Sequence, residues 1–192
     1  MIARGLNLGR SAEHVYGMTL TVRRFAPDEW RLYRDLRLHA LEESPNAFGS
    51  IYAHEVQRTD EDWALRLSRG ATSPRDQPLV AEVNGEPSGL AWARCEEAAP
   101  AIVHLYQMWV VPGERTQGVG RALLGAAVDW SRAVGAEALV LDVTIDNTPA
   151  RRLYERAGFV PIGDPKPLRP GSTVQSQAMR LALTGNAAAP SA

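Results

Sequence analysis

The sequence predicts an α+β fold, in which helices cover both faces of a single sheet. Segments with strand-like and helix-like periodicity follow one another in the order β-α-α-β-β-β-α-β-α-β-β. An Asn-Gly pair marks a hairpin, and a glycine-bearing loop marks a strand-to-helix connection. No repeat or linker divides the 192 residues, so we expect one domain. We place it at residues 19–183, between a flexible N-terminal arm (1–18) and a disordered tail (184–192).

In the first half of the chain, Thr19–Phe25 alternates like a strand. Proline and acidic residues at Ala26–Glu29 then open a helix that ends near Ser44. Asn46–Tyr52 is a loop, and Thr59 is the N-cap of a second helix with an acidic first turn.

A polar break over Ala71–Pro78 precedes a hairpin, because Asn84-Gly85 favours a type I′ turn between Leu79–Val83 and Glu86–Cys95. Ala101–Val111 follows as the central strand. The remaining expected elements are a helix over Gly118–Val134, a buried strand over Ala138–Ile145, a helix over Thr148–Ala157, and strands over Phe159–Ile162 and Val174–Leu183.

The composition restricts the functions that the protein can have. The net charge of −1 gives no electrostatic reason to bind nucleic acid or an anionic membrane. Cys95 is the sole cysteine, which excludes an intramolecular disulfide, and the four histidines lack ligand spacing, so we expect no metal. Residues 1–17 lack the apolar core of a signal peptide or membrane span, and Met18 is an alternative start. We therefore expect a cytoplasmic protein.

The run from Val110 to Arg121 has the features of an anion site. A helix that starts after a strand offers unpaired N–H groups and the positive end of its dipole. Glycine at positions 118 and 120 lets a phosphate approach the backbone, and Arg115 and Arg121 add positive charge. The loop lacks the Gly-Lys-Ser/Thr ending and the three-glycine spacing of nucleotide loops. These features predict a pyrophosphate ligand.

Two motifs resemble signatures of the GNAT N-acetyltransferase family. Arg115-x-x-Gly118-x-Gly120 is similar to the Arg/Gln-x-x-Gly-x-Gly/Ala acyl-CoA loop. The run Asn147-x-x-Ala150-x-x-Leu153-Tyr154-x-x-x-Gly158-Phe159 is similar to the second signature, and the order of the two blocks also fits. The chain is identified as a member on these motifs, which lie within His104–Gly163.

The resemblance implies the GNAT acyl-CoA N-acyltransferase fold, a mixed, mostly antiparallel sheet whose central parallel strands splay apart. Acetyl-CoA is then the co-substrate, and its pantetheine pairs with the strand edge in the gap, where one N–H also stabilises the oxyanion. The residues implied to hold it are Met108, Trp109, Val110, Arg115, Thr116, Gln117, Gly118, Val119, Gly120, Arg121 and Asn147. Asn147 is alternatively a helix N-cap, or serves both purposes.

The resemblance further implies a general acid. Tyr154 matches the tyrosine that protonates the leaving CoA thiolate in many members. A phenol with a pKa of about 10 can give a proton to a thiolate whose conjugate acid has a pKa of about 8.5. The alternative is that Tyr154 only packs on its helix beside Leu153.

Two residues are candidates for the base that takes the proton of the amine. His104 matches a position that carries glutamate or histidine in some members, and Asp142 matches a glutamate position in others. Strand alternation is expected to turn His104, Tyr106 and Met108 toward one face. A water relay is the third alternative.

Two positions in the loop depart from the family pattern. Thr116 stands where glycine is commonest, and we expect it to adopt a φ below zero. Glu114 brings a carboxylate near the pyrophosphate and is expected to point outward. Neither departure indicates a dead site.

The expected acceptor pocket lies beside the first helix. That helix carries Trp30, Tyr33 and Arg37, and it is followed by Phe48–Tyr52; both segments either form a wall of the pocket or pack as plain core. Two functions are compatible with the chain: an N-acetyltransferase that works by direct attack in a ternary complex, and a catalytically silent acyl-CoA-binding regulatory module. The amine acceptor, small molecule or protein, and a homodimer are left open.

Overall fold

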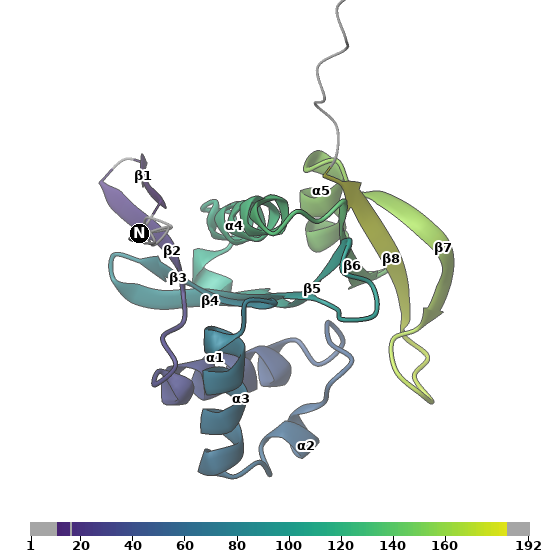
Figure 1. The fold of residues 1–192 in the computed structure, drawn as a ribbon. Coiled ribbons are helices and arrows are strands. Elements are labelled where there is room, and N and C mark those ends of the chain that lie inside the picture. Colours follow the sequence, from purple (N-terminus) through teal and green to yellow (C-terminus); the bar gives the residue numbers. More distant parts are fainter. Residues whose placement is uncertain (1–10, 16, 184–192) are drawn as a thin grey trace, which may run out of the picture.

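The computed structural model describes residues 11–15 and 17–183. One sheet runs in the order β1-β2-β3-β4-β5-β6-β8-β7, with helices on both faces (Figure 1). The strands are β1 (Ser11–Val15), β2 (Met18–Arg24), β3 (Asp76–Val83), β4 (Glu86–Cys95), β5 (Ile102–Val110), β6 (Ala138–Thr144), β7 (Val160–Pro167) and β8 (Gln175–Ala182). The helices are α1 (Trp30–Glu43), α2 (Tyr52–Glu55), α3 (Asp60–Thr72), α4 (Val119–Ala133) and α5 (Thr148–Arg156), with a 3₁₀ turn at Pro112–Glu114. The predicted fold class is confirmed.

The N-terminal arm contains a strand that the sequence did not predict. Ser11–Val15 pairs antiparallel with β2 through a turn at Gly17, whose φ is +81°. The segment is too short and too polar to show an alternating pattern. It forms a strand because its backbone pairs with β2. The other residues of the expected arm, 1–10 and 16, and the expected tail, 184–192, lie outside the described residues.

Strand β3 begins at Asp76, inside the stretch that we expected to be a polar break. The Asp76 side chain accepts hydrogen bonds from Trp92 Nε1 at 2.7 Å and from Arg94 Nε at 2.6 Å, both on β4. Two cross-strand donors therefore let a carboxylate lie in a buried strand position. Strand β7 similarly continues past the expected end, Ile162, to Pro167. Its residues are all exposed, which an edge strand containing glycine and proline tolerates.

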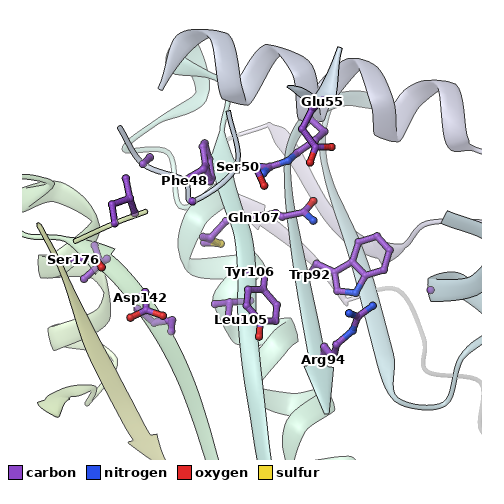
Figure 2. Close-up of a pocket in the computed structure, with 18 of the residues that line it drawn as sticks. Phe48, Ser50, Glu55, Trp92, Arg94, Leu105, Tyr106, Gln107, Asp142 and Ser176 are labelled. Carbon is purple, nitrogen blue, oxygen red and sulfur yellow. The ribbon is translucent and has the colours of Figure 1, made fainter. Parts of the chain in front are cut away.

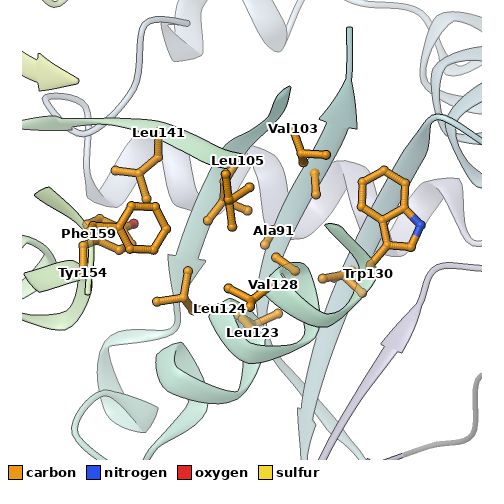
Figure 3. Close-up of a cluster of buried hydrophobic side chains, with 14 of the residues drawn as sticks. Ala91, Val103, Leu105, Leu123, Leu124, Val128, Trp130, Leu141, Tyr154 and Phe159 are labelled. Carbon is orange, nitrogen blue, oxygen red and sulfur yellow. The ribbon is translucent and has the colours of Figure 1, made fainter. Parts of the chain in front are cut away.

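Two apolar cores lie on opposite faces of the sheet. Helix α4 and Tyr154 of α5 pack on one face, where Leu105 of β5 and Leu141 of β6 meet Leu123 (Figure 3). Helices α1 and α3 cover the other face, where Tyr33, Trp63 and Trp92 pack at ring-centroid distances of 5.5–5.7 Å. In the part of the chain that is described, no helix has the length and apolar character to cross a membrane.

A β-bulge at Gln107 divides strand β5. Gln107 has a φ of +58°, and the register with β4 shifts between the pairs Leu90–Trp109 and Trp92–Tyr106. Before the bulge, Tyr106 stacks on His104; beyond it, Met108 packs against the core under α4. The expectation that Met108 shares a face with His104 and Tyr106 is therefore wrong, because the extra residue reverses the facing of the side chains.

Strands β5 and β6 form a parallel pair that parts halfway. Their pairing covers only Ile102–Leu105 of β5 and Ala138–Leu141 of β6. Beyond that point β5 stays paired with β4 up to Val110, and β6 stays paired with β8 up to Thr144. This is the splayed pair that the family resemblance implies.

Packing between α3 and the sheet predicts that alanine has opposite effects on the free energy of unfolding at two helical glycines. A Cβ at Gly70 would lie 2.1 Å from Trp92 Cζ2, whereas a Cβ at Gly125 in α4 meets nothing within 4 Å. We expect Gly70→Ala to lower the free energy of unfolding by about 2 kcal/mol through overpacking. We expect Gly125→Ala to raise it by up to about 1 kcal/mol, because alanine favours the helix. Denaturant unfolding of both variants measures this; equal effects would contradict the packing of α3 on Trp92.

Candidate active site

A cavity of about 1180 Å³ opens where β5 and β6 part. The end nearest the parting is bounded by Leu105–Met108 of β5, Leu141–Thr144 of β6 and the first turns of α5. The far wall belongs to α1–α3 and the loop at Phe48 and Ser50, as Figure 2 shows. The cavity thus joins the gap in the sheet to the face that α1–α3 cover.

Tyr154 lines this cavity from α5. Its side chain packs on Phe159 with ring centroids 5.7 Å apart, and the residue is only 5% exposed. Burial raises the pKa of the Tyr154 hydroxyl well above its ordinary value. The phenol holds its proton more tightly than an exposed tyrosine does, and at neutral pH it is protonated. Tyr154 therefore packs against its neighbours and also lies on the cavity, so the two interpretations of this residue are compatible.

Asn147 caps helix α5 and also lines the cavity. Its Oδ1 accepts a hydrogen bond from the Ala150 N–H at 3.2 Å, so the N-cap interpretation is confirmed. The side-chain amide N–H groups are not used by this cap.

The two candidate bases lie differently. Asp142 is exposed on β6, directly beyond the last β5–β6 pair, and lines the cavity (Figure 2). His104 lies further back on β5, stacked on Tyr106 with ring centroids 5.9 Å apart, and it is not among the cavity-lining residues. Tyr106 is 43% exposed at the mouth, and its hydroxyl donates to Glu96 at 3.3 Å. Burial, and next the Glu96 charge, raise the pKa of Tyr106 to about 12.

Several polar residues of the cavity escaped the sequence analysis. Gln107, at the bulge, accepts a hydrogen bond from the Tyr33 hydroxyl at 3.0 Å. Glu55 is 5% exposed on α2 and accepts from Arg58 Nε at 2.9 Å and Arg66 Nη1 at 3.0 Å. A single glutamine in an apolar strand and a glutamate in a four-residue helix carry no periodic signal, so only the tertiary structure reveals them.

The glycine loop presents a helix N-terminus near the gap. Gly118 is the N-cap of α4 with a φ of +90°, and its carbonyl accepts from the Ala122 N–H at 2.9 Å. The N–H groups of the first turn, at Val119, Gly120 and Arg121, precede the first such bond and have no partner within the helix. The loop is held by a hydrogen bond from Gln117 Nε2 to the Gly113 carbonyl at 3.0 Å.

Arg115 is turned away from the helix N-terminus toward α1. Its guanidinium contacts both Glu43 carboxylate oxygens, the shorter contact being 2.6 Å, and its Nε donates to the Val110 carbonyl at 3.0 Å. Trp109 Nε1 also donates to Glu43, at 3.0 Å. The hydrogen bond from Arg115 is the main reason that the pKa of Glu43 falls to about 2. Arg121, in contrast, is exposed in the first turn of α4.

The edge of β5 that faces the gap has backbone groups free of β4. The Val111 N–H donates to Ser88 on β4 at 2.9 Å. Because successive residues of a strand direct their N–H groups to opposite edges, the Val110 N–H faces away from β4. Trp109 itself is 4% exposed, and Met108 and Val110 pack against the core under α4.

Gly120 has a packing role besides backbone access. A Cβ at this position would lie 3.3 Å from Leu153 Cδ2 on α5 and 3.8 Å from side-chain atoms of Met108 and Val110. Glycine therefore also lets α4 approach α5 and β5 closely.

Thr116 corrects an expectation. Its φ is +69°, not below zero, so a β-branched residue occupies the left-handed region where glycine is at home. The turn from the 3₁₀ segment into α4 imposes this conformation, which explains why glycine is the commonest residue at this position in the family pattern.

Strain at Thr116 predicts that glycine is better tolerated there than elsewhere in the loop. The left-handed conformation costs an L-residue about 1–2 kcal/mol, whereas glycine in place of another residue at a negative φ lowers the free energy of unfolding by about 0.5–1 kcal/mol. We expect Thr116→Gly to be neutral or stabilising. The φ of Glu114 is not positive, so we expect Glu114→Gly to be destabilising. Thermal unfolding compares the two, and a larger loss in Thr116→Gly would argue against strain.

Comparisons with known proteins agree with this geometry. A family model described as "Acetyltransferase (GNAT) family" matches residues 29–159. A mycothiol acetyltransferase of Arthrobacter sp. (strain FB24) is 33% identical over 113 residues, 57% of this chain but only 35% of that protein. A streptothricin acetyltransferase of Streptomyces lavendulae is 30% identical over 175 residues, 78% of this chain and 90% of that protein. The structure of yncA from Salmonella typhimurium with its cofactor acetyl-CoA matches with a TM-score of 0.71 and 24% identity, covering 90% of this chain and 98% of that one.

Proposed function

The chain belongs to the acetyltransferase (GNAT) family, and from this premise we propose that it is an N-acetyltransferase, which moves an acetyl group from acetyl-CoA to a primary amine by direct attack in a ternary complex. One observation carries the proposal: Tyr154, Asp142 and the parted edges of β5 and β6 line the same cavity as the α1–α3 wall. Direct transfer needs such a continuous space, because the amine must reach the thioester carbon while both substrates are bound.

The residues at the gap fit acetyl-CoA. We assign its pyrophosphate to the N–H groups at the start of α4 and to Arg121, since an anion is favoured at a helix N-terminus. Pantetheine then lies along the β5 edge that carries the Val110 N–H, with the free amide of Asn147 on its other side. Arg115 keeps its ion pair with Glu43 and so acts on the loop rather than on the phosphates.

The proposed chemistry needs one bond to form and one to break. The amine nitrogen bonds to the acetyl carbon, a backbone N–H of β5 stabilises the oxygen that gains charge, and the carbon–sulfur bond breaks. Tyr154 gives its proton to the sulfur, which leaves as a thiol. A tyrosine hydroxyl is protonated at neutral pH, so the proton is present when the sulfur needs it.

For the base we favour Asp142 over His104. Asp142 lies at the parting of the strands on the cavity surface, whereas Tyr106 separates His104 from it. A carboxylate at the mouth also attracts the ammonium form in which a primary amine arrives. Water between Asp142 and the amine would carry the proton over any remaining distance.

A catalytically silent acyl-CoA-binding module is the alternative. It would use the same glycine loop, but binding alone requires neither an acid nor a base at the strand gap. The relatives named for mycothiol and for streptothricin differ in their acceptors, so membership of the family leaves the acceptor open. A thiol-release assay with acetyl-CoA and a panel of amines tests the proposal. Binding of CoA without transfer to any amine would favour the silent module.

Removing the Tyr154 hydroxyl should slow the reaction without weakening CoA binding. We expect Tyr154→Phe to lower kcat roughly 10- to 1000-fold, as for a lost general acid, and to leave the Kd for CoA unchanged by titration calorimetry. Tyr52→Phe, on the exposed side of α2, is the matched control and should keep full activity. An unchanged kcat in Tyr154→Phe would reduce Tyr154 to a packing role.

The two candidate bases separate kinetically. We expect Asp142→Asn to lower kcat/KM about 100-fold or more, while His104→Gln stays within about threefold of the parent because its ring is outside the cavity. A pH profile of each variant provides the second readout, since the acidic limb of kcat/KM reports the base of the free enzyme. A limb that disappears only in His104→Gln would transfer the role to His104.

A further inference from the structure

Arg37 is a buried cation of which two guanidinium nitrogens have no hydrogen-bond partner among the described residues. The residue lies on α1, is 2% exposed and lines the cavity. Its Nε and Nη1 are buried and have no hydrogen-bond partner, and its guanidinium lies 4.6 Å from the centre of the Phe48 ring. A buried charge without hydrogen bonds destabilises the fold considerably, so its retention calls for a second explanation.

The carboxylate nearest to Arg37 is already engaged. Glu55 is shared by Arg58 and Arg66, in ion pairs of 2.9 Å and 3.0 Å. From α1–α3 and the segment between α2 and α3, the cavity is lined by four guanidinium groups and two carboxylates, an excess of positive charge: Arg37, Arg58, Arg66 and Arg69 against Glu55 and Asp62. Desolvation lowers the pKa of Arg37 to about 10, which still leaves the side chain charged at neutral pH. The wall is suited to an anion.

The other end of the cavity carries charges of both signs. Asp142 and Glu96 line it together with Lys166 and Arg94, and Arg94 is paired with Asp76 at 2.6 Å. Figure 2 shows Glu55 and Asp142 on opposite sides of Gln107, so a ligand that spans the cavity can meet the Asp142 carboxylate at the transfer end and guanidinium groups at the other.

We propose that the acceptor is an amine that carries a carboxylate several bonds away from the nitrogen, as in ω-amino acids, and that Arg37 binds this carboxylate while the amine lies at Asp142. The inference rests on the proposed acetyl transfer, because Asp142 marks the amine end only if that reaction takes place there. A carboxylate matches the planar donor groups of a guanidinium and supplies the charge that Arg37 lacks. A polycationic acceptor would place a positive charge against the same wall.

The first experiment compares acceptors that differ only in the carboxylate. Thiol release from acetyl-CoA is measured with a series of ω-amino acids of increasing chain length and with the carboxamide of each. We expect the parent protein to prefer the carboxylates at least 100-fold in kcat/KM, and Arg37→Met to reduce this preference to within about threefold. Arg69→Met removes an exposed arginine from the same cavity and should keep the preference. Carboxamides used as well as carboxylates by the parent protein would overturn the inference and leave the acetyltransferase proposal intact.

The second experiment needs no turnover. Because Arg37→Met removes an unpartnered buried charge, we expect the ligand-free variant to melt about 2–4 °C higher than the parent; a lower melting temperature would mean that Arg37 is structural and would overturn the inference. N-acetylated ω-amino acids should raise the melting temperature of the parent protein and of Arg69→Met, but not that of Arg37→Met. If CoA binds but no amine is acetylated, the proposed reaction fails. The shift in melting temperature then decides by itself whether Arg37 binds a carboxylate. No shift in the parent protein would overturn the inference about Arg37.

Discussion

The parting of β5 and β6 is the constraint on which the rest of the site depends. Over Ile102–Leu105 the two strands satisfy each other's backbone, and beyond that point each keeps only its outer neighbour. The bulge at Gln107 accompanies the parting, because an extra residue bends its strand and increases the local twist. The gap lies at the edge of β5 toward which the Val110 N–H points. It also connects the two faces of the sheet, so a ligand bound at α4 can meet one bound under α1–α3.

Charge in the cavity is arranged by the same architecture. On the α1–α3 side of the cavity arginines outnumber carboxylates, whereas Glu96 and Asp142 line the other side of the opening together with Arg94 and Lys166. Burial acts differently on the groups concerned. It raises the pKa of the Tyr154 hydroxyl and leaves the guanidinium of Arg37 without hydrogen bonds at Nε and Nη1. Polar groups that the fold keeps incompletely satisfied are thereby concentrated at one place, as is typical of a ligand site.

Local signals in the sequence account for most of the fold. The Asn84-Gly85 hairpin, the Thr59 cap of α3 and the helix that starts after Gly118 all form as predicted. Each depends on a few neighbouring residues, so local chemistry is sufficient to predict it. The family motifs likewise lead to Tyr154 and Asn147, which both lie on the cavity.

The predictions that failed depended on distant partners or on backbone conformation. Strand β3 starts early because Trp92 and Arg94 satisfy Asp76 from the next strand. Met108 faces away from Tyr106 because Gln107 adopts a positive φ, and no residue type at that position signals a bulge. The missing partners of Arg37 are also visible only in three dimensions. A pattern along the chain can show that an arginine lies on a helix, but not whether its hydrogen bonds are satisfied.

The contact between Glu43 and Arg115 has a consequence for how kinetic data on this protein are interpreted. Glu43 is the last residue of α1, six positions after Arg37, and its carboxylate holds both the glycine loop and Trp109 of β5. Helix α1, which lines the cavity through Arg37, and the loop that precedes α4 are therefore one mechanical unit. In the proposed reaction, a substitution in α1 that never touches a phosphate can therefore still change the apparent affinity for acetyl-CoA. An altered KM for one substrate thus shows that the unit of α1 and the loop was disturbed. It does not show that the substituted residue contacts that substrate.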